Sequence, residues 1–309
     1  VLNVSNLEAK RDVETNIQKC ELSVRQNQRF NLYEFPKLLS FSSLTSNTHS
    51  IDENAKDVDA VLISSQQIES ENQILEDEIN KHTFPKGANT GNLLHYIFEN
   101  IEFSNPDTYE ENITEQLTSF EYDEKWTEIT LNWINDCLNH NIKGNLSLKD
   151  LYEQDVLKEM EFHFPVDSIS SNKLMEIVRE QSWPNTSEVF SGFMKGFIDL
   201  IFRHDDKYYI LDYKSNYLGP DSDSYAFEFL EEAMLHSNYD LQYHIYTTAL
   251  VIYLEKRIPD FNYERNFGGV FYFFLRGCEI DTPESGVFYD KPSSKKIDEL
   301  RVILGGQND

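Results

Sequence analysis

The chain has 309 residues with 54 acidic side chains against 27 Lys and Arg, giving a formal net charge of -27. Hydrophobic residues make up 39% and aromatic residues 13%, which excludes a disordered acidic polymer and indicates a substantial buried core. The longest apolar run, residues 269–275, is far shorter than the roughly 18 residues that span a bilayer, so we expect no membrane association. Because affinity for polyanions comes from Lys and Arg, any nucleic-acid role must depend on local geometry, bound cations or a partner.

The N-terminal part differs in composition from the rest, since the first glycine is Gly87. We expect residues 1–45 to be a segment partly packed on the core through an apolar stretch near its end. Residues 46–83 are expected to form an acidic, flexible linker, because they are rich in polar residues and poor in aromatic ones. Residues 84–309 then form the folded domain.

Within this domain the pattern predicts helices and strands in alternation. Asn89 and Thr90 are candidate caps for a helix, and Pro165 is expected to end a strand. The order of helix, three strands, helices and strand predicts an α/β fold with a mixed central sheet flanked by helices. The predicted helices cover residues from 89 onward, 107–140, 222–236 and 239–257, and the predicted strands cover 158–164, 193–203, 207–214 and 268–275, with a hairpin turn at 204–206.

Three cysteines, Cys20, Cys137 and Cys278, occur in no C-x-x-C spacing. This excludes a disulfide framework, a zinc ribbon and a four-cysteine iron–sulfur cluster. The chain shows no basic and apolar leader sequence and begins without Met. We therefore expect a cytoplasmic protein and a fragment of a longer chain.

The residues that suggest chemistry lie on the two strands of the predicted hairpin. Side chains alternate along a strand, so Asp212 and Lys214 project from one face and Tyr213 from the other. If the strands are adjacent, Asp199 lies near Asp212. Two carboxylates and an ammonium then meet in an apolar environment. Such a site suits Mg²⁺ and phosphate chemistry, but the same spacing also fits a buried Asp–Lys ion pair without catalytic function.

Four further polar residues stand near these strands in the predicted fold. His95 lies at the edge of an apolar helical face, where a histidine is more often a core residue than a ligand. Glu161 lies on the preceding strand, where an outward-facing polar position is ordinary. Gln242 and Tyr246 are four residues apart and share one helix face. None of them indicates a site in isolation.

Taken together in this order, the residues resemble the RecB-type nuclease domains of the PD-(D/E)XK nuclease superfamily. Ile198 stands where the superfamily name has Pro, a substitution that RecB-like members share. The phosphate-binding loop GxxxxGK[ST] of a helicase motor is absent from the sequence. The matching segments are residues 84–88, 91–95, 160–162, 195–204, 208–216, 218–219, 239–243, 246–247, 267–270 and 274–277, and residues 40–44 resemble the start of the same domain.

The resemblance implies a role for each of these positions. A divalent metal, Mg²⁺ with Mn²⁺ as a substitute, would be held between protein ligands, and a lysine would act on the attacking water or the scissile phosphate. The implied metal ligands are His95, Asp199, Asp212 and the backbone carbonyl of Tyr213. The implied catalytic residues are Asp199, Asp212, Lys214 and the additional acid Glu161. The implied QxxxY motif, which positions the site or the DNA strand, consists of Gln242 and Tyr246.

The resemblance also implies the activity and the partners. We expect a hydrolase of the exodeoxyribonuclease V type, with exonuclease and endonuclease activity on unwound strands during double-strand-break repair and recombination. The expected partners are single- and double-stranded DNA with linear ends, the RecC and RecD subunits, the missing RecB helicase portion and the RecA recombinase.

The sequence also allows two alternatives to a RecB-type nuclease, a docking module and a restriction-type endonuclease. A nuclease-fold module that docks RecA or RecC, with little activity in isolation, would be expected to have lost a ligand or the lysine, and none is lost. A stand-alone restriction-type endonuclease would share little beyond the Asp…Asp-x-Lys core, whereas the RecB-like segments extend on both sides of it.

Overall fold

The computed structural model describes residues 37–41, 79–181, 189–280, 282 and 285–304. All of them belong to one compact unit, Pro36–Asp309. The expected acidic linker lies almost wholly outside the described residues, as does most of the N-terminal segment. No helix in the described part of the chain is long and apolar enough to cross a bilayer.

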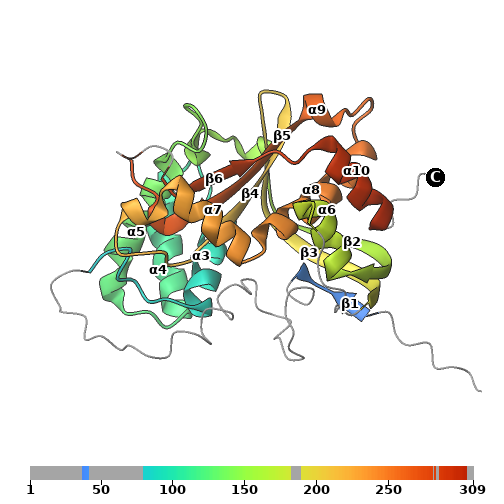
Figure 1. Ribbon diagram of the computed structural model, residues 1–309. Helices are drawn as coiled ribbons and strands as arrows, with labels where there is room; N and C mark the ends of the chain where they lie inside the picture. Colours follow the sequence, from blue (N-terminus) through green and yellow to red (C-terminus); the bar gives the residue numbers. More distant parts are fainter. Residues whose placement is uncertain (1–36, 42–78, 182–188, 281, 283–284, 305–309) are drawn as a thin grey trace, which may run out of the picture. The chain divides into compact units, whose positions relative to one another are not determined.

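The described residues form a sheet with helices on both of its faces (Figure 1). The strands are β1 (Lys37–Leu39), β2 (Val156–Ser170), β3 (Val189–His204), β4 (Lys207–Lys214), β5 (Phe267–Phe274) and β6 (Val287–Asp290), and the helices are α3 (Ala88–Asn100), α4 (Tyr109–Ser119), α5 (Thr127–Asn139), α6 (Ser171–Arg179), α7 (Phe227–His236), α8 (Tyr239–Glu255), α9 (Tyr263–Asn266) and α10 (Ser294–Ile303).

The sheet has six strands and is mixed, which confirms the predicted fold class. Strand β3 pairs with β2 along one edge over nearly its whole length. On its other edge β3 pairs in parallel with β1 at residues 192–194 and antiparallel with β4 at residues 200–204. Among the described residues, no strand pairs with residues 195–199 on that edge. Within the described part of the chain, the middle of β3 therefore has no neighbouring strand on that edge.

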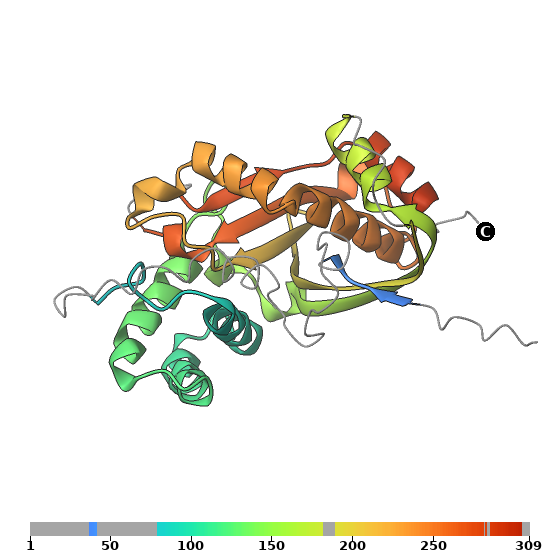
Figure 2. The same cartoon turned by 60° about the horizontal axis from the view of Figure 1, so that its bottom comes forward.

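A separate hydrophobic core lies on each face of the sheet. The first core packs residues of α6, α8 and α10 against one face, and the second packs α3, α4 and α5 against the other. Figure 2 shows both layers, with the teal and green helices α3–α5 below the sheet. Strands β3, β4 and β5 alternate apolar side chains between the two cores, as expected for strands buried on both sides.

Three expectations about elements are wrong in detail. Strand β2 continues through Pro165, which pairs with Phe193, because β2 lies at the sheet edge and Pro is tolerated there. The helical region 107–140 is two helices, α4 and α5. Helix α3 begins after Gly87, which adopts φ 112°, and its N-cap makes no side-chain hydrogen bond, so neither Asn89 nor Thr90 caps it.

The hairpin turn between β3 and β4 is confirmed. Asp205 and Asp206 have φ of 48° and 59°, the left-handed conformation that a two-residue turn of this kind requires at both positions. Aspartate tolerates this conformation better than most residues. The acidic turn therefore fixes the register that brings the chemically important ends of the strands together.

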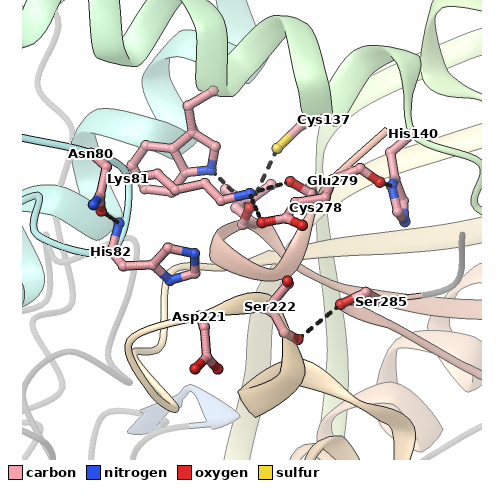
Figure 3. A network of polar contacts seen from close by, with 12 residues as sticks. Asn80, Lys81, His82, Cys137, His140, Asp221, Ser222, Cys278, Glu279 and Ser285 are labelled. Atoms are coloured by element: carbon pink, nitrogen blue, oxygen red, sulfur yellow. Dashed lines mark hydrogen bonds and ion pairs between the residues drawn. The ribbon is translucent and has the colours of Figure 1, made fainter. Parts of the chain in front are cut away.

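The segment before α3 is fastened to the sheet by buried polar contacts. The Arg276 guanidinium is fully buried and donates to the carbonyls of Lys81, Phe84 and Pro85, the last over 2.9 Å. In Figure 3 the Lys81 side chain reaches the Cys278 carbonyl and the Glu279 carboxylate. This double attachment sets the position from which α3 begins.

Candidate active site

The β3–β4 hairpin opens at its far end into a gap with a carboxylate on each side. The ladder ends at the pair Leu200–Leu211, and Asp199 and Asp212 are the next residues on the two strands. In place of another ladder bond, the Tyr213 backbone N–H donates to Asp199 Oδ2 over 2.9 Å. The hairpin thus presents both predicted acids where the strands separate.

Side-chain alternation changes phase at Asp199. Ile198 belongs to the core beneath α8, whereas Leu200, two residues further, belongs to the core beneath α3. On β2, the residue opposite Asp199 is Glu159, which has φ 51° and is missing from a ladder that its neighbours continue. Positive φ is uncommon for a residue other than glycine, and such residues concentrate at functional sites.

Helix α3 adds a histidine to this pair of acids. His95 is buried, and its Nδ1 lies 3.4 Å from Asp199 Oδ2. Its ring meets the Tyr213 ring edge-on with 6.0 Å between centroids. Potential ligand atoms of His95, Glu159 and Asp199 all lie within 4.8 Å of one another. Among the described residues this is the only such group of three or more.

Asp212 and Lys214 point to the opposite side of the sheet, toward α8. Lys214 Nζ lies 2.9 Å from Asp212 Oδ1, and both side chains are 4% exposed. The ammonium also donates to Gln242 Oε1 over 3.2 Å, and Gln242 Nε2 donates to Tyr246 Oη over 3.2 Å. The structure therefore joins the lysine to both residues of the predicted QxxxY pair.

Two tyrosines that the sequence analysis did not single out surround the same lysine. Tyr272 Oη, on β5, donates to Gln242 Oε1 over 2.7 Å. Lys214 Nζ lies 4.0 Å from the centroid of the Tyr239 ring and 5.2 Å from that of Tyr272. Aromatic faces stabilise a desolvated ammonium. Because every residue of β5 is buried, no periodic signal distinguishes Tyr272 from its purely structural neighbours.

The two aspartates differ in their electrostatic environment. Burial alone would raise the pKa of Asp199, but the His95 ring, the Tyr213 N–H and the Lys214 ammonium outweigh burial and lower that pKa. The pKa of Asp212 is raised, first by burial and then by the charge of Asp199, which Lys214 only partly offsets. The carboxylates therefore compete for few positive charges, an arrangement that an additional cation would relieve.

The donor atoms fit a hard divalent cation. Asp212 Oδ1 is buried and lies 2.9 Å from the Lys214 ammonium, and no other described group donates a hydrogen bond to it. Such an oxygen retains lone pairs for a metal. Carboxylate oxygens suit Mg²⁺ and Mn²⁺, and imidazole is an acceptable ligand for transition metals.

The structure does not bring Glu161 to this group. Its carboxylate is on the exposed surface of β2, 2.7 Å from Lys195 Nζ and 3.0 Å from His163 Nε2. The acid beside Asp199 is instead Glu159, two residues earlier. Strict alternation would place the two glutamates on one face, so the sequence could not choose between them without the local backbone at Glu159.

A mixed sheet with Asp199 and an Asp-x-Lys triplet at the open end of adjacent strands, covered by helices on both faces, defines a PD-(D/E)XK-type core. No protein-family model matches the chain. The chain is 40% identical over 277 residues to the RecBCD enzyme subunit RecB of Haemophilus influenzae, an alignment that covers 85% of this chain and 22% of that protein.

Similar relationships extend to other bacteria. Identity is 34% over 303 residues with RecB of Escherichia coli K12, covering 94% of this chain and 25% of the relative. It is 30% over 292 residues with RecB of Borreliella burgdorferi, covering 89% and 24%. The chain belongs to the RecB family, and it spans 22% to 25% of the length of these three relatives.

Proposed function

We propose that this chain is a divalent-metal-dependent nuclease that hydrolyses phosphodiester bonds of DNA. The observation that carries the proposal is the group of His95, Glu159 and Asp199 at the open end of one hairpin, with the buried Asp212–Lys214 pair beginning at the next position of the adjacent strand. Burying carboxylates beside one another costs stability, and such groups are typical of catalytic sites. A module used only for docking would gain nothing from them.

Five groups would hold the metal in this proposal. They are the side chains of His95, Glu159, Asp199 and Asp212 and the backbone carbonyl of Tyr213. Mg²⁺ is the proposed ion and Mn²⁺ its substitute. When bound, the cation would offset negative charge on a phosphate and favour the ionised form of water.

The chain's own residues would orient the lysine during the reaction. Attack on phosphorus adds negative charge to the phosphate oxygens, and in this proposal the Lys214 ammonium would stabilise that charge. Gln242 accepts a hydrogen bond from Lys214, and Tyr246 fixes the Gln242 amide. Because the lysine side chain is almost fully buried, this positioning occurs away from bulk water, where electrostatic stabilisation is strongest.

Membership of the RecB family supports a proposal for the substrates and partners. We propose that the chain acts within a RecBCD-type assembly, with RecC, RecD and the remaining RecB portion, on single- and double-stranded linear DNA in the cytoplasm. Its role there would be exonuclease and endonuclease cleavage in double-strand-break repair and recombination, with RecA as a further partner. A docking module for RecA or RecC with little activity of its own is the alternative.

Cleavage of an end-labelled single-stranded oligonucleotide at low salt, with Mg²⁺ or with EDTA, tests the proposal. We expect cleavage only with Mg²⁺. Asp212→Ala should reduce the rate by about a hundredfold or more, because it removes a metal ligand. Lys214→Ala should reduce turnover while metal binding is retained. Asp205→Asn, in the exposed hairpin turn, is the matched control and should cleave like the wild type.

Folding of each variant is checked by circular dichroism. Asp212→Ala leaves the Lys214 ammonium with Gln242 and two aromatic rings, so we expect the variant to fold. If it does not, Asp199→Asn provides the second test of the metal site. Unchanged cleavage by folded Asp199→Asn and Asp212→Ala variants would contradict the proposal, and a folded wild type without metal-dependent cleavage would favour the docking module.

A further inference from the structure

The part of β3 that precedes Asp199 exposes two phenylalanines. Phe193 and Phe197 are 43% and 41% exposed, although both lie within strand β3. Their even-numbered neighbours Met194 and Ile198 are buried in the core beneath α8. The phenylalanines therefore project from the other face. A contiguous exposed apolar patch is typical of an interaction surface, whereas a single exposed hydrophobic side chain is ordinary.

Strand β2 completes this face with polar and basic groups. Residues that pair directly across antiparallel strands share a face. Lys195 Nζ lies 4.9 Å from the Phe197 ring centroid and 2.7 Å from Glu161 Oε1, so the ammonium is held beside the ring. The face, called the Phe193–Phe197 face below, consists of Phe193, Lys195 and Phe197 with their cross-strand partners Pro165, His163 and Glu161.

The Phe193–Phe197 face leads directly to the candidate active site. Phe197 is two residues before Asp199, which contacts His95 of α3 on the same side of the sheet. The second core, beneath α3–α5, contains Leu200 and Phe202 but none of the β3 residues before Asp199. Figure 2 shows the teal and green helices under one end of the sheet only. A polymer lying along this face would meet Asp199 where the helical layer begins.

The chemistry of this face suits unpaired nucleotides. Aromatic side chains bind single strands by stacking on the bases, which tolerates any sequence. Phe193 and Phe197 are about 13 Å apart along the strand, so each ring can stack a separate base. Lys195 lies between them and its charge is balanced by Glu161, so this face is close to neutral on a chain whose net charge is -27. Phosphates therefore meet less repulsion here than a chain of this charge would otherwise present.

We propose that the Phe193–Phe197 face binds a single DNA strand by base stacking and delivers it to the metal site. This inference deepens the proposed nuclease function and rests on it for the direction of delivery, but the binding itself does not require cleavage. It also identifies the local geometry through which an acidic chain can hold a polyanion.

The binding test uses a fluorescein-labelled oligo(dT) 20-mer at low salt with Ca²⁺, and the intact length of the oligonucleotide is verified after each titration. Phe193→Ala and Phe197→Ala should each weaken binding by about fivefold to a hundredfold, because each removes one stacking platform. Phe197→Trp should restore binding. A duplex of the same length should bind more weakly and be insensitive to these substitutions, because its bases are already stacked on one another.

Phe227→Ala is the matched control, since Phe227 is 54% exposed on α7, outside this face. Equal losses in Phe227→Ala and Phe197→Ala, unchanged affinity in both face variants, or no binding by the wild type would each overturn the proposal. Unchanged affinity would leave the face to a protein partner. Binding that depends on Phe197 in a chain without cleavage would support the face and count against the nuclease, whereas cleavage with an unchanged KM in Phe197→Ala would do the reverse.

Discussion

Glu159 illustrates how a single backbone conformation can decide the membership of a site. Glu159 has a positive φ, and its carboxylate lies beside the Asp199 carboxylate and the His95 ring. Glu161, by contrast, pairs with Lys195 at the surface. A residue held in a sparsely populated conformation persists only when its surroundings impose it. The local strain at Glu159 is therefore consistent with a metal-binding role.

Glu159→Gln should weaken metal binding more than Glu161→Gln does. We expect Mn²⁺ to raise the melting temperature of the wild type, because a ligand that binds only the folded state stabilises it, by about 2.7 kcal/mol at a hundred times its Kd. The shift should shrink in Glu159→Gln and persist in Glu161→Gln. Equal shifts in both variants would show that Glu159 is not a ligand.

Tyr272 provides a second test at single-residue resolution. Tyr272→Phe removes only the hydroxyl that orients Gln242 toward Lys214. We expect kcat to fall about fivefold with KM unchanged, since one buried hydrogen bond contributes about 1 kcal/mol. Tyr243→Phe, which loses a 2.8 Å bond to Asp290, is the control. A change in KM alone would argue against a role of Tyr272 in positioning the lysine.

At this scale the sequence was most informative where residues alternate on a strand. The opposite facing of Lys214 and Tyr213 follows from alternation and is observed in the structure. The acid at Glu159 could not be chosen, because its position depends on a φ angle that glutamate rarely adopts. Tyr239 and Tyr272 could not be identified from the sequence either. A buried tyrosine that contacts a lysine has the same local sequence pattern as a tyrosine that only packs in a core.

At the scale of elements, the strands and helices next to the site were predicted better than the periphery. The hairpin β3–β4 was predicted because its turn has two adjacent aspartates and its strands are strongly apolar. Helices α6 and α10 and strand β6 were missed, since they are short and their apolar residues pack on α8 and β5 rather than forming a long periodic pattern. The expectation that Pro165 ends a strand was wrong for another reason. Proline is tolerated in an edge strand, and only the order of strands in the sheet shows that β2 is one.

Arg276 connects elements that are distant in sequence, and its removal should destabilise the fold. Its guanidinium donates to carbonyls of Ser215, Lys81, Phe84 and Pro85. Arg276→Leu leaves these buried acceptors unsatisfied, so we expect the free energy of unfolding to fall by about 3 kcal/mol or more. Urea denaturation measures the change.

The control for Arg276 is Arg203→Leu, which removes an exposed ion pair with Asp206. We expect its urea midpoint to match the wild type, because exposed ion pairs contribute little. If Arg276→Leu were as stable as Arg203→Leu, the segment before α3 would not depend on the buried guanidinium.

At the scale of the whole molecule, buried histidines make stability depend on pH. His140 lies at the end of α5, with its Nδ1 2.9 Å from the Glu279 carbonyl oxygen (Figure 3). Burial lowers the pKa of His140; Lys81 lowers it further, while the Glu279 carboxylate and two backbone contacts oppose the change. The folded chain therefore keeps this ring neutral at a pH where the unfolded chain protonates it.

Stability from neutral His140 is fully present above its unfolded pKa of about 6.5 and is lost as the pH falls toward the lowered folded pKa. Between about pH 7.5 and about pH 5.5, the wild type should lose more stability than His140→Gln. His236 is exposed at the end of α7, and the His236→Gln variant should lose as much stability as the wild type. The three urea midpoints at both pH values decide this, and parallel changes in all three would exclude the contribution of His140.

The candidate active site takes its groups from both layers of the molecule. His95 comes from the helices below the sheet, and Gln242 and Tyr246 come from the helix above it. On heating, the proposed cleavage activity should consequently be lost when either helical layer unfolds, even if the sheet is still folded. A proteolytic fragment without α3–α5 would keep the lysine and its tyrosines but lose the histidine, so limited digestion should abolish the proposed cleavage activity while every residue of the hairpin remains intact.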